Sequence, residues 1–247
     1  KRHWRALAVF PADFERAAAA AVWELEPDAA QDLLSELVRL SLVDFPPSPL
    51  GRGAGGEGRY HLHDLARLFA DSQLHKAKRD PSRQRHSAHY AAVLRSAKEL
   101  YKRGGNSTLL GLSLFDRERH NIEAGQAWAA ANMARDEAAA RTCSEYPDAG
   151  AYVLDLRLHP RERIRWLEAA VKAARILKNR EAEGAHLGNL GVAYAALGET
   201  RKAIEFYEQI RVIHREIGDR RGEGNALGNL GLAYDDLGET RKAIDFY

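Results

Sequence analysis

Apolar residues recur every three or four positions along most of the chain, the spacing that places them on one side of an α-helix. The clearest example lies toward the C-terminal end, where Leu187, Leu190 and Tyr194 form one stripe that Gly198 ends. A second stripe follows, and its members are Ala203, Ile204, Tyr207, Ile210 and Ile217. The pattern predicts two helices joined by a glycine turn, with Gly218–Asp219 ending the second helix.

This helical hairpin is repeated. Residues 184–207 and 224–247 are identical at 18 of 24 positions, and a degenerate copy precedes them. Such hairpins bury their apolar faces by stacking on one another. We therefore predict an α-solenoid over residues 136–247, with a degenerate repeat at about 144–180, a full repeat at about 184–223 and a truncated repeat at 224–247. From the missing initial Met and the end of the chain inside a helical pattern, we expect a piece of a longer protein.

The repeated residues resemble the tetratricopeptide repeat (TPR), whose pattern is matched by Leu187, Leu190–Gly191, Tyr194, Gly198, Ala203 and Tyr207. The period of 40 residues is similar to that of the longer-helix subclass seen in kinesin light chains, whereas the usual repeat has 34. The resemblance implies a concave groove that binds a protein or peptide, lined by the first helix of each hairpin. Its inward positions would be Ala185, Asn189, Val192 and Ala196, then Asn225, Asn229, Leu232 and Asp236. Asn189 and Asn229 are the expected polar contacts to a peptide backbone; alternatively, each bonds only a neighbouring repeat.

The first 75 residues follow a different pattern. Helices are predicted over 14–25 with Asp13 as its cap, over 29–40 after Pro27–Asp28, and over 65–74 with Asp64 as its cap. The strand-like segments 41–45 and 59–62 flank a Pro/Gly-rich loop. This order describes a winged-helix domain at 1–75, followed by a helical linker at 76–135. The predicted fold class is thus mainly α: a winged helix with a small two-stranded wing, then an α-solenoid of TPR-like hairpins.

The N-terminal region resembles the winged-helix domain of STAND proteins, which are signal-transducing P-loop ATPases. In that family a Met-His-Asp or Leu-His-Asp motif follows the wing, and this chain has Leu62–His63–Asp64 there. The resemblance implies that His63 contacts the β-phosphate of ADP held by the protein's own nucleotide-binding domain, and that Asp64 orients the loop. It implies ADP or ATP with Mg as cofactors of the full-length protein and none in this fragment. Antiviral defence and transcriptional control both fit the family.

Composition changes this picture in two respects. The net charge of +2 divides into −3 for residues 1–75, +6 for 76–143 and −1 for 144–247. The basic excess over 76–103 is either a solvated face or a docking surface for an acidic partner. The predicted reading helix of the winged helix carries Asp28, Asp32 and Glu36 against Arg39, which disfavours nucleic acid as a partner. The one cysteine, Cys143, excludes a disulfide framework, and no apolar run or signal peptide is visible, so we expect a cytoplasmic protein without membrane contact.

Several motifs carry no chemistry. Gly53–Gly58 matches G-x-G-x-x-G, but it lies in a Pro-rich loop before a strand, where a phosphate-binding turn needs a helix to follow. There is no P-loop, so we expect no enzyme activity in this piece. The pairs His61/His63 and His86/His89 lack carboxylates at ligand spacing, so no metal site is predicted. Four tryptophans at helix stripes are expected in the core.

The leading hypothesis is therefore the regulatory and ligand-sensing arm of a STAND ATPase, with the winged helix as a latch on the nucleotide-binding domain. The alternatives are a TPR scaffold with a purely structural winged helix, and a DNA-binding regulator. The truncated repeat leaves an apolar face uncovered, from which we expect fraying or end-to-end self-association.

Overall fold

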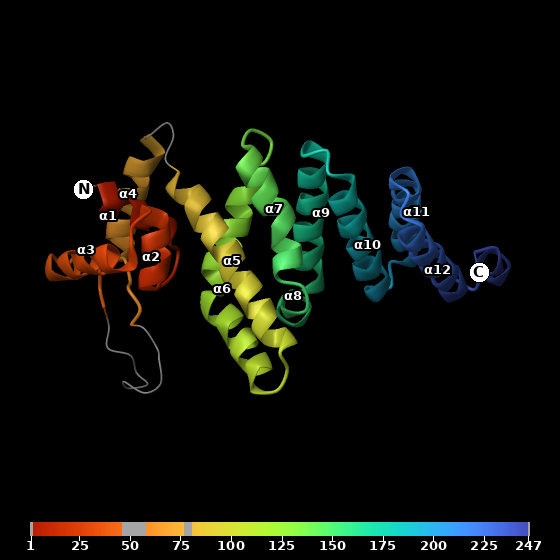
Figure 1. Cartoon of the computed structure of the whole chain (residues 1–247), viewed down its shortest axis with the longest axis horizontal. Coiled ribbons are helices and arrows are strands. Elements are labelled where there is room, and N and C mark those ends of the chain that lie inside the picture. Colours follow the sequence, from red (N-terminus) through yellow and green to blue (C-terminus); the bar gives the residue numbers. More distant parts are fainter. Residues whose placement is uncertain (1, 46–57, 77–80, 247) are drawn as a thin grey trace.

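The computed structural model describes residues 2–45, 58–76 and 81–246. These residues form an elongated row of helices that runs from an N-terminal bundle to the last repeat, with the two ends of the chain far apart (Figure 1). The prediction of a mainly helical chain with a TPR-like solenoid is confirmed. Most of the glycine-rich motif, residues 53–57, and the cap expected at Asp80 lie outside the described residues.

The N-terminal bundle contains four α-helices and a short 3-10 helix, Leu7–Val9. The α-helices are α1 (Arg2–Ala6), α2 (Arg16–Trp23), α3 (Pro27–Arg39) and α4 (Asp64–Lys76). Leu7, Phe14 and Leu34 are fully buried between them. The cap predicted at Asp13 is wrong: α2 begins after Glu15, whose side chain makes no capping bond. Asp13 instead uses its carbonyl and carboxylate in contacts with distant residues.

The predicted two-stranded wing is not supported. Among the described residues no segment is a strand; there are two isolated antiparallel bridges, Phe14 with Tyr60 and Asp44 with His61. The Asp44–His61 bridge has both backbone hydrogen bonds, at 2.8 and 2.9 Å, so the two segments do approach as expected. Residues 60 and 61 pair with different neighbours, so neither ladder extends beyond one residue pair.

The predicted linker is a long antiparallel hairpin of α5 (Ser82–Lys102) and α6 (Asn106–Asn132). A side chain at Gly111 would place its Cβ 2.4 Å from the backbone oxygen of Ala97, so this glycine sets the closest approach of the two helices. Buried residues of the N-terminal bundle, of the hairpin and of the helices that follow, as far as Ala173, form one continuous hydrophobic core. The hairpin is thus packed against both neighbours and is not an extended connector.

The remaining helices stack as hairpins and have a second core of their own. They are α7 (Glu137–Ala149), α8 (Val153–Arg157), α9 (Pro160–Ile176), α10 (Arg180–Ala196), α11 (Thr200–Ile217), α12 (Arg220–Asp236) and α13 (Thr240–Ile244). Asp136 caps α7 as its sequence position suggests, but α7 continues through Pro147 to Ala149. Ile217 does not share the buried face of α11: its exposed fraction is 42%. Trp23 and Trp166 are buried, and Trp4 and Trp128 pack against the core as expected.

Equivalent contacts recur from one repeat to the next. Tyr194 stacks on Phe206 at 5.4 Å, and Tyr234 stacks on Phe246 at the same distance. Between hairpins, Arg175 pairs with Glu183 at 2.7 Å and Arg215 pairs with Glu223 at 2.7 Å. The 40-residue spacing in sequence is therefore a spacing of identical interfaces in the structure.

Candidate functional site

A groove of about 350 Å³ lies between the first helices of two successive repeats, α10 and α12, with the α11–α12 turn at one end. Its lining includes five of the eight positions predicted to point inward, namely Ala185, Asn189, Val192, Asn225 and Asn229. The other three, Ala196, Leu232 and Asp236, are exposed on the same helices but lie beyond the hollow. The structure thus brings together residues that are 40 positions apart in the sequence.

Three asparagines dominate the polar lining of this groove. Asn189 comes from α10, and Asn225 and Asn229 lie one helical turn apart on α12. None of their side chains makes a hydrogen bond within the described part of the chain, so the alternative that they only join neighbouring repeats is not supported there. An amide offers two N–H donors and a carbonyl acceptor, which matches the groups of an extended peptide backbone. The groove therefore carries unused hydrogen-bonding capacity at three places.

The end of the groove at the α11–α12 turn is charged, which the sequence pattern did not indicate. His214 Nδ1 lies 2.9 Å from Asp219 Oδ2, and Arg221 lines the groove beside them. Asp219 also caps α12 by accepting the backbone N–H of Gly222 at 2.9 Å. This hydrogen bond, together with His214, lowers the pKa of the Asp219 carboxyl. Their spacing from the asparagines became evident only when the helices were packed.

The second predicted site, His63 and Asp64, lies at the start of α4. The side chain of His63 is 73% exposed, and its Nε2 is 3.3 Å from Asp44 Oδ2. Asp64 pairs with Arg67 at 3.2 Å. One turn further, Leu65, Leu68 and Phe69 expose 82%, 59% and 58% of their surface, a large apolar area for one helix. His63 is therefore accessible, beside an apolar face that the described residues leave uncovered.

Carboxylates do lie near the histidine pair that the sequence pattern left without partners. His61 Nδ1 is 2.8 Å from Asp13 Oδ1, and Asp44 is near His63. These carboxylates come from segments 17 to 48 residues away, so spacing along the sequence could not show them. Among the described residues there is no group of three or more metal-binding side chains.

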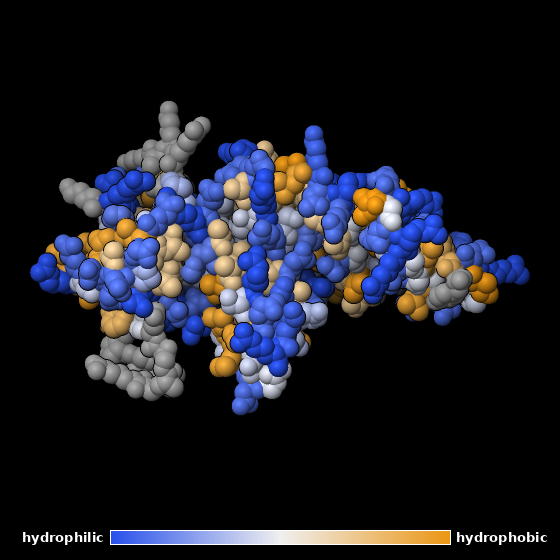
Figure 2. All heavy atoms as spheres, in the orientation of Figure 1, coloured by the Kyte–Doolittle hydropathy of each residue, from blue (hydrophilic) through white to orange (hydrophobic). Residues whose placement is uncertain are grey.

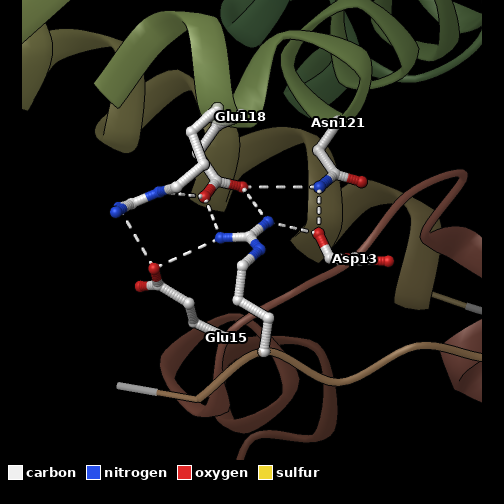
Figure 3. A network of polar contacts seen from close by, with 6 residues as sticks. Asp13, Glu15, Glu118 and Asn121 are labelled. Carbon is white, nitrogen blue, oxygen red and sulfur yellow. Dashed lines mark hydrogen bonds and ion pairs between the residues drawn. The ribbon is translucent and has the colours of Figure 1, made fainter. Parts of the chain in front are cut away.

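A polar network joins the N-terminal bundle to α6, and Figure 3 shows it from close by. Arg59 donates to both oxygens of Glu118, at 2.5 and 3.2 Å, and to the Asp13 carbonyl at 2.5 Å. Asn121 donates to the same carbonyl at 3.0 Å, and Arg117 links Glu118 to Glu15 at 3.1 Å on each side. Although burial disfavours its charge, the hydrogen bond and charge of Glu118 raise the pKa of Arg59. Sequence analysis missed this cluster because its members are up to 108 residues apart.

The surface shows where other partners would have to bind. Figure 2 shows a mainly hydrophilic face on which hydrophobic atoms emerge in separate areas along the row of helices. Asp28, Asp32 and Glu36 are exposed on α3, so the acidic character of this helix faces solvent. Phosphate contact by this helix remains disfavoured. None of the helices in the described ranges has the length and apolar character needed to cross a bilayer.

Comparison with known proteins supports the repeat assignment. The sequence profile of the tetratricopeptide repeat family matches residues 183–247. The regulatory protein AfsR of Streptomyces griseus is 39% identical over 72 residues, which is 29% of this chain and 6% of AfsR. This chain therefore aligns with only a small part of that much longer relative.

Two solved structures are similar at the level of the helical arrangement. A STAND protein with a tetratricopeptide repeat sensor from Pyrococcus horikoshii matches 99% of this chain and 48% of its own, with 16% identity and a TM-score of 0.40. A putative kinesin light chain from Podospora anserina, with nearly identical TPR-like repeats, matches 66% of this chain and 72% of its own, with 18% identity and a TM-score of 0.44. What is established is that residues 183–247 are tetratricopeptide repeats.

Proposed function

We propose that the chain is the regulatory, ligand-sensing arm of a STAND ATPase and that its repeats bind an extended segment of a protein or peptide inducer. The observation that carries the binding role is the groove between α10 and α12, in which Asn189, Asn225 and Asn229 have no hydrogen-bond partner among the described residues. A ligand backbone would supply those partners. The match to a regulatory protein, AfsR, supports a regulatory setting.

The asparagine spacing favours an extended ligand over a compact one. Asn189 belongs to one repeat and Asn229 holds the equivalent position in the next, so a ligand that reaches both must run across the two first helices. A bound peptide would expose its N–H and C=O groups at regular intervals along this path. Each neutral hydrogen bond contributes about 0.5–1.5 kcal/mol net, so two asparagines account for about a tenfold to hundredfold change in affinity.

The test uses a random peptide library displayed on phage, selected on this chain, and the selected peptides as labelled probes. In a variant with Asn189→Ala and Asn229→Ala, we expect the affinity to fall about tenfold or more by fluorescence anisotropy. The matched control is Asn106→Ala, at an exposed position outside the groove. Equal affinities of the double variant and the control would contradict the groove assignment.

The N-terminal bundle would act as a latch on the nucleotide-binding domain, as the Leu62–His63–Asp64 motif suggests. An exposed imidazole beside the apolar face of Leu65, Leu68 and Phe69 suits a surface that docks on another domain near a phosphate. ADP, or ATP with Mg, would be bound by that domain, and this chain would supply only the histidine. Inducer binding would favour the open state by its higher affinity for that state.

The latch is tested in the full-length protein by the dissociation rate of ADP. His63→Ala should release ADP faster and raise basal activity, whereas His120→Ala, exposed on α6, should leave both unchanged. An unchanged ADP dissociation rate in the His63 variant would exclude the latch and leave the peptide-binding role standing.

A second function, a passive TPR adaptor, is favoured by the polar network around Arg59. That network ties segments 11–15 and 58–62 to α6, as expected of a bundle that only supports the repeats. The two functions differ in the ADP experiment, because an adaptor needs no response at His63.

A further inference from the structure

A second hollow, of about 210 Å³, lies beside the peptide groove and outside the two repeats that the family pattern covers. It is formed where α7 ends, α8 interrupts the hairpin and α9 and α10 pass behind. Its walls are mainly apolar: Pro147, Tyr152, Leu154, Trp166 and Leu167 line it, with Asn189 at one side. The volume is more than ten times the roughly 10–15 Å³ that one water requires, so a side chain fits in it.

The turn before α8 gives this hollow a fixed wall. Tyr152 has φ +71° and ψ −46°, a conformation that non-glycine residues rarely adopt. Its ring stacks on Tyr101 of α5, at 6.1 Å and an interplanar angle of 11°. The stacking holds Tyr152 against α5, so the hollow stays open in the absence of a ligand.

The charged groups of the hollow neutralise each other. Arg163 Nε lies 2.5 Å from Asp155 Oδ1, and this ion pair joins α9 to α8 at the rim. No other charged side chain lines the hollow in the part of the chain that is described. An uncharged occupant therefore matches the site, because a charged one would lose its hydration without gaining a counter-charge.

Asn189 connects the hollow to the groove, since its side chain lines both. A peptide held by Asn189 would pass the mouth of the hollow within one or two residues, so a side chain on its near face can enter. The path from α12 to α8 is thus one surface with a polar part and an apolar pocket.

We propose that this hollow is the specificity pocket of the peptide site and takes one large uncharged apolar side chain, of the leucine or phenylalanine class, from the bound segment. The inference rests on the proposed peptide-binding function and adds to it which residue type the ligand must carry. Burying such a side chain accounts for about a tenfold to hundredfold gain in affinity.

The pocket is tested first without any peptide, so that the result does not depend on the proposed function. N-acetyl-leucinamide and N-acetyl-phenylalaninamide are titrated into the chain, and the indole N–H of Trp166, assigned by Trp166→Phe, is followed by NMR. We expect a saturable shift with both compounds and none with N-acetyl-glutaminamide. Ala151→Trp, which fills the pocket from its rim, should abolish the shift, whereas Leu156→Trp, on the exposed side of α8, should preserve it.

The second measurement uses the peptides selected from the phage library. Those peptides should share a large apolar residue at one position, and Ala151→Trp should weaken their binding at least tenfold, with Leu156→Trp unchanged. Binding that depends on the asparagines but not on Ala151 would refute the pocket and retain the groove. A library that yields no binder would refute the proposed function, while the Trp166 titration still decides whether the pocket accepts an apolar side chain. Circular dichroism of each variant separates loss of binding from loss of folding.

Discussion

The contact between Gly191 and Tyr207 lends itself to a quantitative test of how the repeat hairpin is built. A Cβ added at Gly191 would lie 2.3, 2.7 and 3.0 Å from three ring atoms of Tyr207, whereas carbon atoms in contact are normally about 3.5–4.0 Å apart. The Tyr207 ring is only 4% exposed, so it cannot move aside into solvent. Gly191→Ala therefore forces α10 and α11 apart by about 1 Å or displaces the ring.

Two opposing effects determine the size of the change. Replacing glycine by alanine inside a helix favours folding by about 1 kcal/mol. Overpacking a buried contact costs about 1–3 kcal/mol, and three ring atoms inside normal contact distance place this site in the upper part of that range. We therefore expect Gly191→Ala to lower the free energy of unfolding by about 1–2 kcal/mol.

The same helix provides the control. A Cβ at Gly188, three residues earlier, would meet only Ile210 Cδ1, at an ordinary 3.7 Å. Gly188→Ala should therefore gain the helix propensity alone, about 1 kcal/mol of stability. Urea unfolding followed by circular dichroism measures both variants against the wild type, provided the slope of the transition is unchanged. If Gly191→Ala proved as stable as Gly188→Ala, the close approach of the two helices would not be what requires glycine there.

Three further predictions follow from buried groups. Glu118→Ala should lower the free energy of unfolding by about 2 kcal/mol, because it leaves the partly buried Arg59 without its main partner; Glu145→Ala, which removes a half-exposed ion pair with Arg95, should cost less than about 1 kcal/mol in the same urea assay, and equal losses would contradict this reasoning. Burial and the nearby His89 and Arg83 lower the pKa of His86 to about 3, so the unfolded chain takes up a proton there first: stability should be full above about pH 6.5 and fall as the pH decreases, by up to about 1.4 kcal/mol per pH unit. His86→Phe should flatten that slope in unfolding measured at several pH values, and an identical slope would exclude the assignment. Burial also raises the pKa of Cys143 to about 12, so iodoacetamide should modify this thiol only in denaturant, as mass spectrometry would show; rapid modification of the native protein would overturn this.

The repeats were predictable because their packing is local. Leu187, Leu190 and Tyr207 follow the helical period, and Gly198 and Gly218 adopt the positive φ expected of helix ends. Repetition of the same residues 40 positions later adds a second copy of the evidence. Sequence reasoning did less well at Ile217, which keeps the period of α11 but lies on its last turn, beyond the contact with α10 and α12.

The N-terminal region and the candidate sites were less predictable because their contacts are long-range. The period-two pattern of residues 59–62 indicated a strand, yet Tyr60 and His61 pair with two different segments, so no strand forms. The groove asparagines were identified from the repeat pattern. His214 and Arg221 were missed, since nothing in their local sequence shows that they lie beside Asn225.

By itself, the sequence determined the helices of the repeats, their turns and the 40-residue spacing of their interfaces, because helix period, glycine conformation and stacking of adjacent hairpins depend on residues close together in the chain. Only the tertiary structure decided that Arg59 and Asn121 bind one carbonyl of Asp13, and that Trp166 and Asn189 line one hollow. Those arrangements depend on how separate helices are placed, and placement is fixed by the shape of a shared core that no single segment encodes.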